Sequence, residues 1–128
     1  MNSWLFHIAI SAALAVPVEI AARYFRLWVY TPPWKVLVNV LITVALIYGT
    51  LAWLTAGLSL PTQFMCGAGI GIAYEILNFS ILNSWYFPED KCSFLKGKPA
   101  LVIGVGLAWG VYPTLTNLLI GVMVRQGH

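Results

Sequence analysis

Residues 62–82 read TQFMCGAGIGIAYEILNFSIL, an apolar run with a single carboxylate, Glu75, in its second half. A helix of about 20 apolar residues crosses the roughly 30 Å hydrocarbon layer of a bilayer, so this run predicts a transmembrane helix. Residues 4–24, 34–57 and 100–124 form three further runs of this kind. No run alternates polar and apolar residues as a strand does. The expected fold is therefore all-α, a polytopic membrane protein with four transmembrane helices.

Composition supports this class. Of the 128 residues, 60% are hydrophobic and only 9% are charged, whereas soluble domains have about a quarter charged residues. The length fits one domain, 1–128. Basic residues are few and gather in two loops, so the net charge of +3 does not indicate a nucleic-acid partner. No Cys, His, Asp or Glu spacing suggests a metal site, and we expect no metal or cofactor.

The basic residues predict an orientation. Six of the seven Lys and Arg residues lie in or beside segments 24–35 and 83–99. Cytoplasmic loops carry such an excess, so both loops are expected in the cytoplasm and both termini outside, in a bacterial inner (plasma) membrane. Aromatic residues in the same segments predict an interfacial belt that anchors the helices: Trp28, Tyr30, Trp34, Trp85 and Tyr86.

The two halves of the chain resemble each other. In a gapless alignment of residues 19–32 with 75–88 the coinciding positions are Glu19/Glu75, Ile20/Ile76, Tyr30/Tyr86 and Pro32/Pro88. Each half would contain a helix, an aromatic loop and a second helix. The pattern predicts a tandem two-helix repeat, with halves at about 1–58 and 59–128 in the same orientation.

The two intramembrane glutamates predict a site. A carboxylate at membrane depth is costly, so it normally faces the bundle interior. By depth along the spans, a pocket in the cytoplasmic half would collect five ligand-binding candidates: Glu19, Asn39, Glu75, Asn78 and Trp109. Glu19 and Glu75 are also the catalytic candidates. Structural roles stay open for both: an i,i+4 ion pair with Arg23 for Glu19, and a hydrogen bond between helices for Glu75.

Three functions fit this pattern. The first is binding or transport of a small lipophilic or cationic molecule, coupled or not to a proton, at an intramembrane carboxylate. The second is a membrane enzyme that uses the two glutamates for acid and base chemistry on a lipid or isoprenoid. The third is a non-catalytic subunit or assembly factor of a larger membrane complex.

Small residues and prolines add two structural expectations. Stripes on spans three and four allow close helix approach and offer faces for a second copy or a membrane partner: Gly67, Gly71, Gly106, Gly110 and Gly121. Pro17 and Pro113 lie inside spans one and four, and each is expected to bend its helix because proline lacks the backbone N–H.

Overall fold

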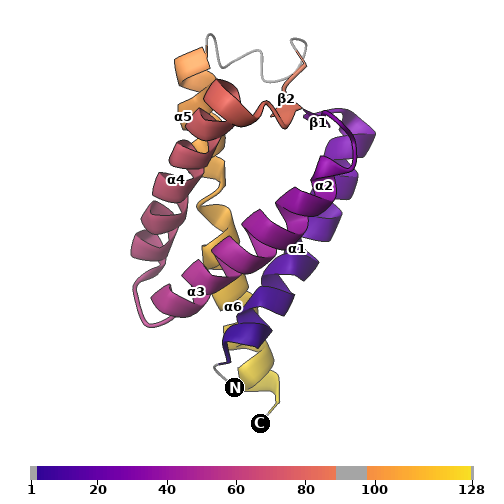
Figure 1. Cartoon of the computed structure of the whole chain (residues 1–128). Coiled ribbons are helices and arrows are strands. Elements are labelled where there is room, and N and C mark those ends of the chain that lie inside the picture. The colour runs from indigo at the N-terminus through magenta and orange to yellow at the C-terminus, as the bar shows by residue number, and fades with distance from the viewer. Residues whose placement is uncertain (1–2, 89–97, 128) are drawn as a thin grey trace.

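A computed structural model describes residues 3–88 and 98–127. Its helical segments are α1 (Trp4–Phe25), α2 (Lys35–Val38), η1 (Asn39–Tyr48), α3 (Gly49–Thr55), α4 (Leu60–Leu77), η2 (Asn78–Leu82), α5 (Lys98–Ala108) and α6 (Val111–Gln126). Segments η1 and η2 are π-helical and continue their neighbours without a break. The strands are β1 (Val29–Tyr30) and β2 (Trp85–Tyr86). The termini lie together at one end, and the strands lie at the other (Figure 1).

The described residues contain four helices that are long and apolar enough to cross a membrane: Trp4–Phe25, Lys35–Thr55, Leu60–Leu82 and Ala100–Gln126. These agree with the four predicted runs. Large apolar side chains such as Leu5, Ile20 and Ile81 point outward, with 65–71% of their surface exposed. Polar side chains such as Ser11 and Gln63 are buried. This inside-out distribution suits helices surrounded by lipid, where polar groups find partners only within the bundle.

The ends of the helices have local causes. The hydroxyl groups of Ser3 and Ser59 accept hydrogen bonds from Phe6 N and Thr62 N, which satisfies free amides in the first turns of α1 and α4. At the other ends, Arg26 (φ 52°) and Asn83 (φ 46°) adopt left-handed conformations that stop the helices. Both helices therefore end just before a strand of the aromatic loops.

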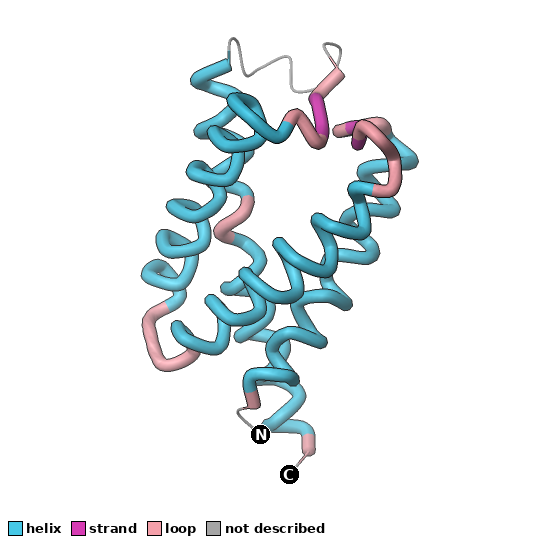
Figure 2. Tube along the Cα trace, viewed as in Figure 1, coloured by secondary structure: helices cyan, strands magenta, loops and turns pink. Residues whose placement is uncertain are grey.

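The fourth span is interrupted where the sequence predicted a bend. Proline at position 113 cannot donate to the carbonyl group of Trp109, which instead accepts from Tyr112 N at 3.2 Å. Helix α5 ends at Ala108 and α6 starts at Val111, so Trp109 and Gly110 form a turn between them. Figure 2 shows this turn as a loop segment in the middle of the helical pair. The Trp109 side chain lies beside α4, next to Gly71.

The described residues are mostly helical, as predicted, and one short ribbon accompanies the four long helices. Strands β1 and β2 pair antiparallel, with Val29 opposite Tyr86 and Tyr30 opposite Trp85, and form a two-stranded ribbon (Figure 2). The two aromatic loops that align in sequence therefore lie side by side in space. Strands of two residues are too short to show an alternating pattern, so no strand could be predicted here. The tandem repeat itself stays a prediction.

The glycine stripes of spans three and four pack against each other. A Cβ atom added at Gly67 would lie 2.9 Å from Gly110 Cα, and one added at Gly71 would lie 2.5 Å from the Gly106 carbonyl oxygen. These four glycines thus bring α4 close to α5 and α6 within the chain. A partner contact through spans three and four stays a prediction, and of the five stripe glycines Gly121 is the one at which an added Cβ meets no atom within 4 Å.

We expect Gly71→Ala to destabilise the protein, because its methyl group would collide with Trp109 Cβ and the Gly106 carbonyl. Overpacking of this kind costs about 1–3 kcal/mol. Thermal unfolding in detergent micelles measures the loss. Gly69→Ala on the same helix is the control, since nothing lies within 4 Å of its added Cβ. Equal stability of the two variants would contradict the close packing.

Candidate functional site

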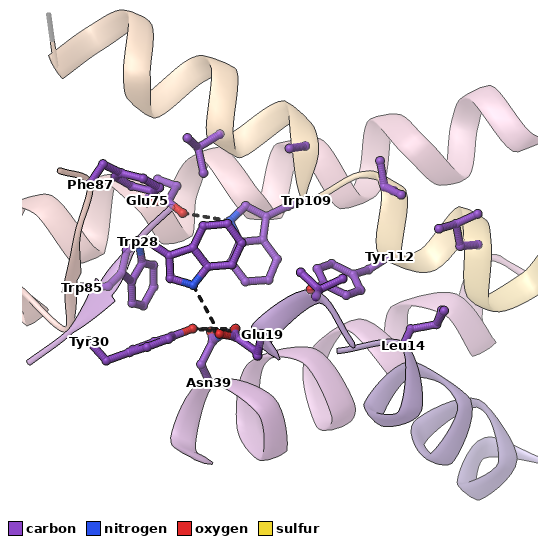
Figure 3. Close-up of a pocket in the computed structure, with 15 residues that line it drawn as sticks. Leu14, Glu19, Trp28, Tyr30, Asn39, Glu75, Trp85, Phe87, Trp109 and Tyr112 are labelled. Atoms are coloured by element: carbon purple, nitrogen blue, oxygen red, sulfur yellow. Dashed lines mark hydrogen bonds between the residues drawn. The ribbon is translucent and has the colours of Figure 1, made fainter. Parts of the chain in front are cut away.

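A cavity of about 270 Å³ opens between the spans below the aromatic ribbon, and both glutamates of the apolar helices line it. Glu19 comes from α1 and Glu75 from α4, so each pair of spans contributes one carboxylate. The other lining residues are Leu14, Val18, Trp28, Tyr30, Asn39, Trp85, Phe87, Val105, Ala108, Trp109, Val111, Tyr112 and Leu115 (Figure 3). Apolar and aromatic side chains thus form most of the wall around two acidic groups.

Glu19 is held by three neutral donors. Tyr30 Oη donates to its Oε1 at 2.7 Å, Asn39 Nδ2 donates to the same oxygen at 3.0 Å, and Trp28 Nε1 donates to Oε2 at 3.3 Å. All three partners donate, which suits a carboxylate that only accepts. Burial, followed by the negative charge of Glu19, raises the pKa of Tyr30 well above its usual value, so its phenol retains the proton that it donates.

The hydrogen bonds continue from Glu19 into the bundle. Asn39 Nδ2 also donates to Tyr30 Oη at 2.8 Å, and Tyr74 Oη donates to Asn39 Oδ1 at 3.3 Å. Thr43 Oγ1 in turn donates to Tyr74 Oη at 2.7 Å. This network joins spans one, two and three. It therefore fixes the position of Glu19 relative to the ring of Tyr74.

The Glu75 carboxyl group accepts fewer hydrogen bonds than that of Glu19. Trp109 Nε1 donates to Glu75 Oε1 at 2.9 Å (Figure 3), and the Trp85 side chain also interacts with the carboxyl group, but Oε2 is buried and has no partner at hydrogen-bond geometry among the described residues. The whole side chain is buried, with 0% of its surface exposed. An unsatisfied buried polar atom costs about 1–3 kcal/mol, and more for a charged group, so this oxygen requires an explanation.

Aromatic rings pack around Glu75. Trp109 stacks on Tyr48 with ring centroids 5.2 Å apart, and its edge contacts Tyr74 at 5.6 Å. The Trp85 ring packs in T-shaped contacts against Tyr74 and Tyr30, with ring centroids 5.0 Å and 5.9 Å away. Tyr48 Oη donates to the Gly67 carbonyl at 2.8 Å, which anchors this cluster to α4. The rings are therefore held in place by packing and by hydrogen bonds.

Four of the five predicted ligand-binding residues line the cavity: Glu19, Asn39, Glu75 and Trp109. Asn78 does not. Its Oδ1 accepts from Ser84 N at 2.8 Å and from Trp85 N at 3.4 Å, and its Nδ2 donates to the Trp85 carbonyl at 3.1 Å. Asn78 is buried at the start of η2, where it holds the start of β2 instead of facing the cavity.

The structure also revises two other expectations. Glu19 forms no ion pair with Arg23, because its oxygens accept from Trp28, Tyr30 and Asn39. The predicted interfacial belt divides: Trp34 and Tyr86 are exposed, by 60% and 47%, whereas the other three rings turn into the cavity. These rings, together with Phe87 and Tyr112, are site residues that the sequence pattern did not predict. The pairing of the two aromatic loops would have indicated them.

No group of three or more metal-ligating side chains occurs within residues 3–88 and 98–127. The segment 89–97, which includes most of the predicted basic loop, lies outside the described residues. Models of protein families, curated proteins and solved structures give no match to this chain, so the functional assignment depends on the chemistry of the cavity.

We expect Asn78→Ala to destabilise the protein by about 1–3 kcal/mol, because Ser84 N and the Trp85 carbonyl would lose buried partners. Chemical or thermal unfolding in micelles measures this loss. Ser80→Ala, at an exposed position of the same helical segment, is the control and should leave stability unchanged. A neutral Asn78→Ala variant would show that this side chain does not hold the strand.

Proposed function

We propose that the chain is an integral membrane protein that binds a small lipophilic cation in the cavity between Glu19 and Glu75. In this proposal the aromatic loops face the cytoplasm and both termini lie outside, as the distribution of Lys and Arg predicts. The membrane is a bacterial inner membrane. Binding at this depth is the first step of transport across the bilayer.

The observation that carries the proposal is the free oxygen of Glu75. Oε2 is buried, belongs to a side chain that lines the cavity and has no hydrogen-bond partner among the described residues. A bound ligand with positive charge would supply the missing interaction. When the ligand leaves, a proton taken up at the same oxygen would neutralise its negative charge.

Charge favours a cation over a neutral or anionic ligand. Glu19 and Glu75 both line the cavity, and among the described residues their hydrogen-bond donors are neutral indole, phenol and amide groups. None of the Lys and Arg side chains that the structure describes lines this cavity. The negative charge that two carboxylates bring into an apolar chamber is therefore left for a ligand to balance.

The wall favours an organic cation over a metal ion. Six aromatic side chains line the cavity: Trp28, Tyr30, Trp85, Phe87, Trp109 and Tyr112. Aromatic faces attract quaternary ammonium groups, and several rings around one site are the usual way of recognising them. The cavity of about 270 Å³ has room for a compact ammonium compound with one apolar substituent.

Benzyltrimethylammonium is a suitable probe for the purified protein in micelles. We expect it to bind and to change the tryptophan fluorescence, because Trp28, Trp85 and Trp109 line the cavity. Glu75→Gln keeps the shape of the side chain but removes its charge, and should weaken binding at least tenfold, about 1.4 kcal/mol. Because protonation neutralises a carboxylate, affinity should fall as the pH is lowered, and this dependence should shrink in Glu75→Gln.

The matched control is neopentylbenzene, in which carbon replaces the charged nitrogen of the probe. Equal affinity for the two compounds would contradict recognition of a cation. Unchanged affinity in both Glu75→Gln and Glu19→Gln would contradict a site at the carboxylates. A protein that binds neither compound, and is extracted only as part of a larger assembly, would favour the role of a non-catalytic subunit.

The unequal hydrogen bonding of the two glutamates favours a second candidate, acid and base chemistry on an apolar lipid. Glu19 has donors at both oxygens and is held as an acceptor, whereas Glu75 has one oxygen free to give or take a proton. Two carboxyl groups in different surroundings can divide acid and base roles. Aromatic walls would stabilise positive charge that develops on a polyene.

Incubation with a polyene isoprenoid separates this candidate from simple binding. For an enzyme we expect a product of changed mass or absorption, lost by at least a hundredfold in Glu75→Gln, because general acid–base groups contribute about 10²–10⁴-fold. For a binding protein we expect the polyene to be recovered unchanged. Labelled benzyltrimethylammonium exchange in proteoliposomes then tests transport, with Glu75→Gln as the inactive variant.

A further inference from the structure

A second cavity of about 460 Å³ lies outside the first, where α1 ends and α2 begins. Two basic residues, Arg23 and Arg26, line it together with apolar residues of the same corner. The full lining is Glu19, Ile20, Arg23, Arg26, Trp28, Val29, Tyr30, Pro33 and Val36. Its charged groups are two guanidinium groups and the shared carboxylate of Glu19, whereas the first cavity has two carboxylates and no basic group among the described lining residues.

The two arginines are available to a ligand. Both side chains are exposed, and neither forms an ion pair with a carboxylate of the described residues. Glu19 lies one turn before Arg23, but its oxygens accept from Trp28, Tyr30 and Asn39. The carboxylate is thus engaged on the side of the inner cavity. Among residues 3–88 and 98–127, the guanidinium groups of the outer cavity therefore have no carboxylate as an ion-pair partner.

The backbone places the two arginines close together. Arg23 is in the last turn of α1, and Arg26 is the cap residue that follows it. The N–H group of Arg26 donates to the carbonyl groups of Ala22 and Arg23, and its left-handed φ of 52° ends the helix there. The pair therefore marks the end of the first apolar span, at the level where a bilayer presents its headgroups.

We infer that this outer cavity binds the phosphate group of an anionic membrane lipid, with Arg23 and Arg26 as its ligands. The inference rests on the membrane insertion contained in the proposed function, and concerns a different site. Guanidinium groups bind phosphate through paired hydrogen bonds. Ile20, Pro33 and Val36 provide apolar surface for the first carbons of the acyl chains. Basic pockets between membrane helices on the cytoplasmic side bind such headgroups.

Native mass spectrometry of the detergent-solubilised full chain tests this site. The probes are phosphatidylglycerol and phosphatidylcholine with identical acyl chains. We expect tighter binding of phosphatidylglycerol, weakened about fivefold by Arg23→Gln or by Arg26→Gln, since a basic residue near a lipid surface contributes about 1 kcal/mol. Lys35→Gln, on the same side of the membrane but outside the cavity lining, and Arg125→Gln, at the opposite end of the chain, should bind as the unaltered chain does.

Three results would overturn the inference. Equal binding of the two lipids removes the preference for an anionic headgroup. A loss in Lys35→Gln as large as in Arg23→Gln assigns the effect to general surface charge. Competition by glycerol phosphate or inorganic phosphate at the concentration of the lipid assigns the site to a free phosphate. The melting temperature of each variant is measured in parallel, and benzyltrimethylammonium binding, measured without added lipid, reports on the inner cavity alone.

Discussion

The structure depends on one constraint: a polar group within an apolar bundle must find its partner inside the same chain. Glu19 meets this constraint through Trp28, Tyr30 and Asn39, which ties span one to the first aromatic loop and to span two. Glu75 meets half of it through Trp109, which ties span three to span four. The two carboxylates thus link the spans through hydrogen bonds. Their donors, three of them aromatic, also line the cavity.

Much of the fold is predictable from the sequence, because lipid imposes strong rules on it. Apolar runs of about 20 residues, the breaks between them and the proline at 113 gave the four helices and the interruption at Trp109. The π-helical turns at Asn39–Tyr48 and Asn78–Leu82 have no such signal, since the same residues fit an ordinary helix. The aromatic ribbon has none either, because its strands contain two residues each.

The site was predictable in part, for a similar reason. Charge inside an apolar span singles out Glu19 and Glu75, and depth along the helices adds Asn39 and Trp109. Trp28, Tyr30 and Trp85 were not predicted as site residues. Tryptophan and tyrosine near the end of a helix look the same in a sequence whether they face lipid headgroups or a cavity. Asn78 was misassigned because a buried helical face does not say whether an amide meets a cavity or the backbone of the next strand.

The two cavities have a wall in common, and this relates the two proposed ligands. Glu19, Trp28 and Tyr30 line both, and hydrogen bonds from Trp28 and Tyr30 to Glu19 hold that wall together. A phosphate drawn to Arg23 on the outer side brings negative charge near Glu19, which strengthens the field that attracts a cation on the inner side. Coupling between sites is reciprocal, so a cation in the inner cavity would favour the lipid phosphate to the same extent. A lipid phosphate in the outer cavity would then contribute to cation binding in the inner cavity, as the lining side chains do.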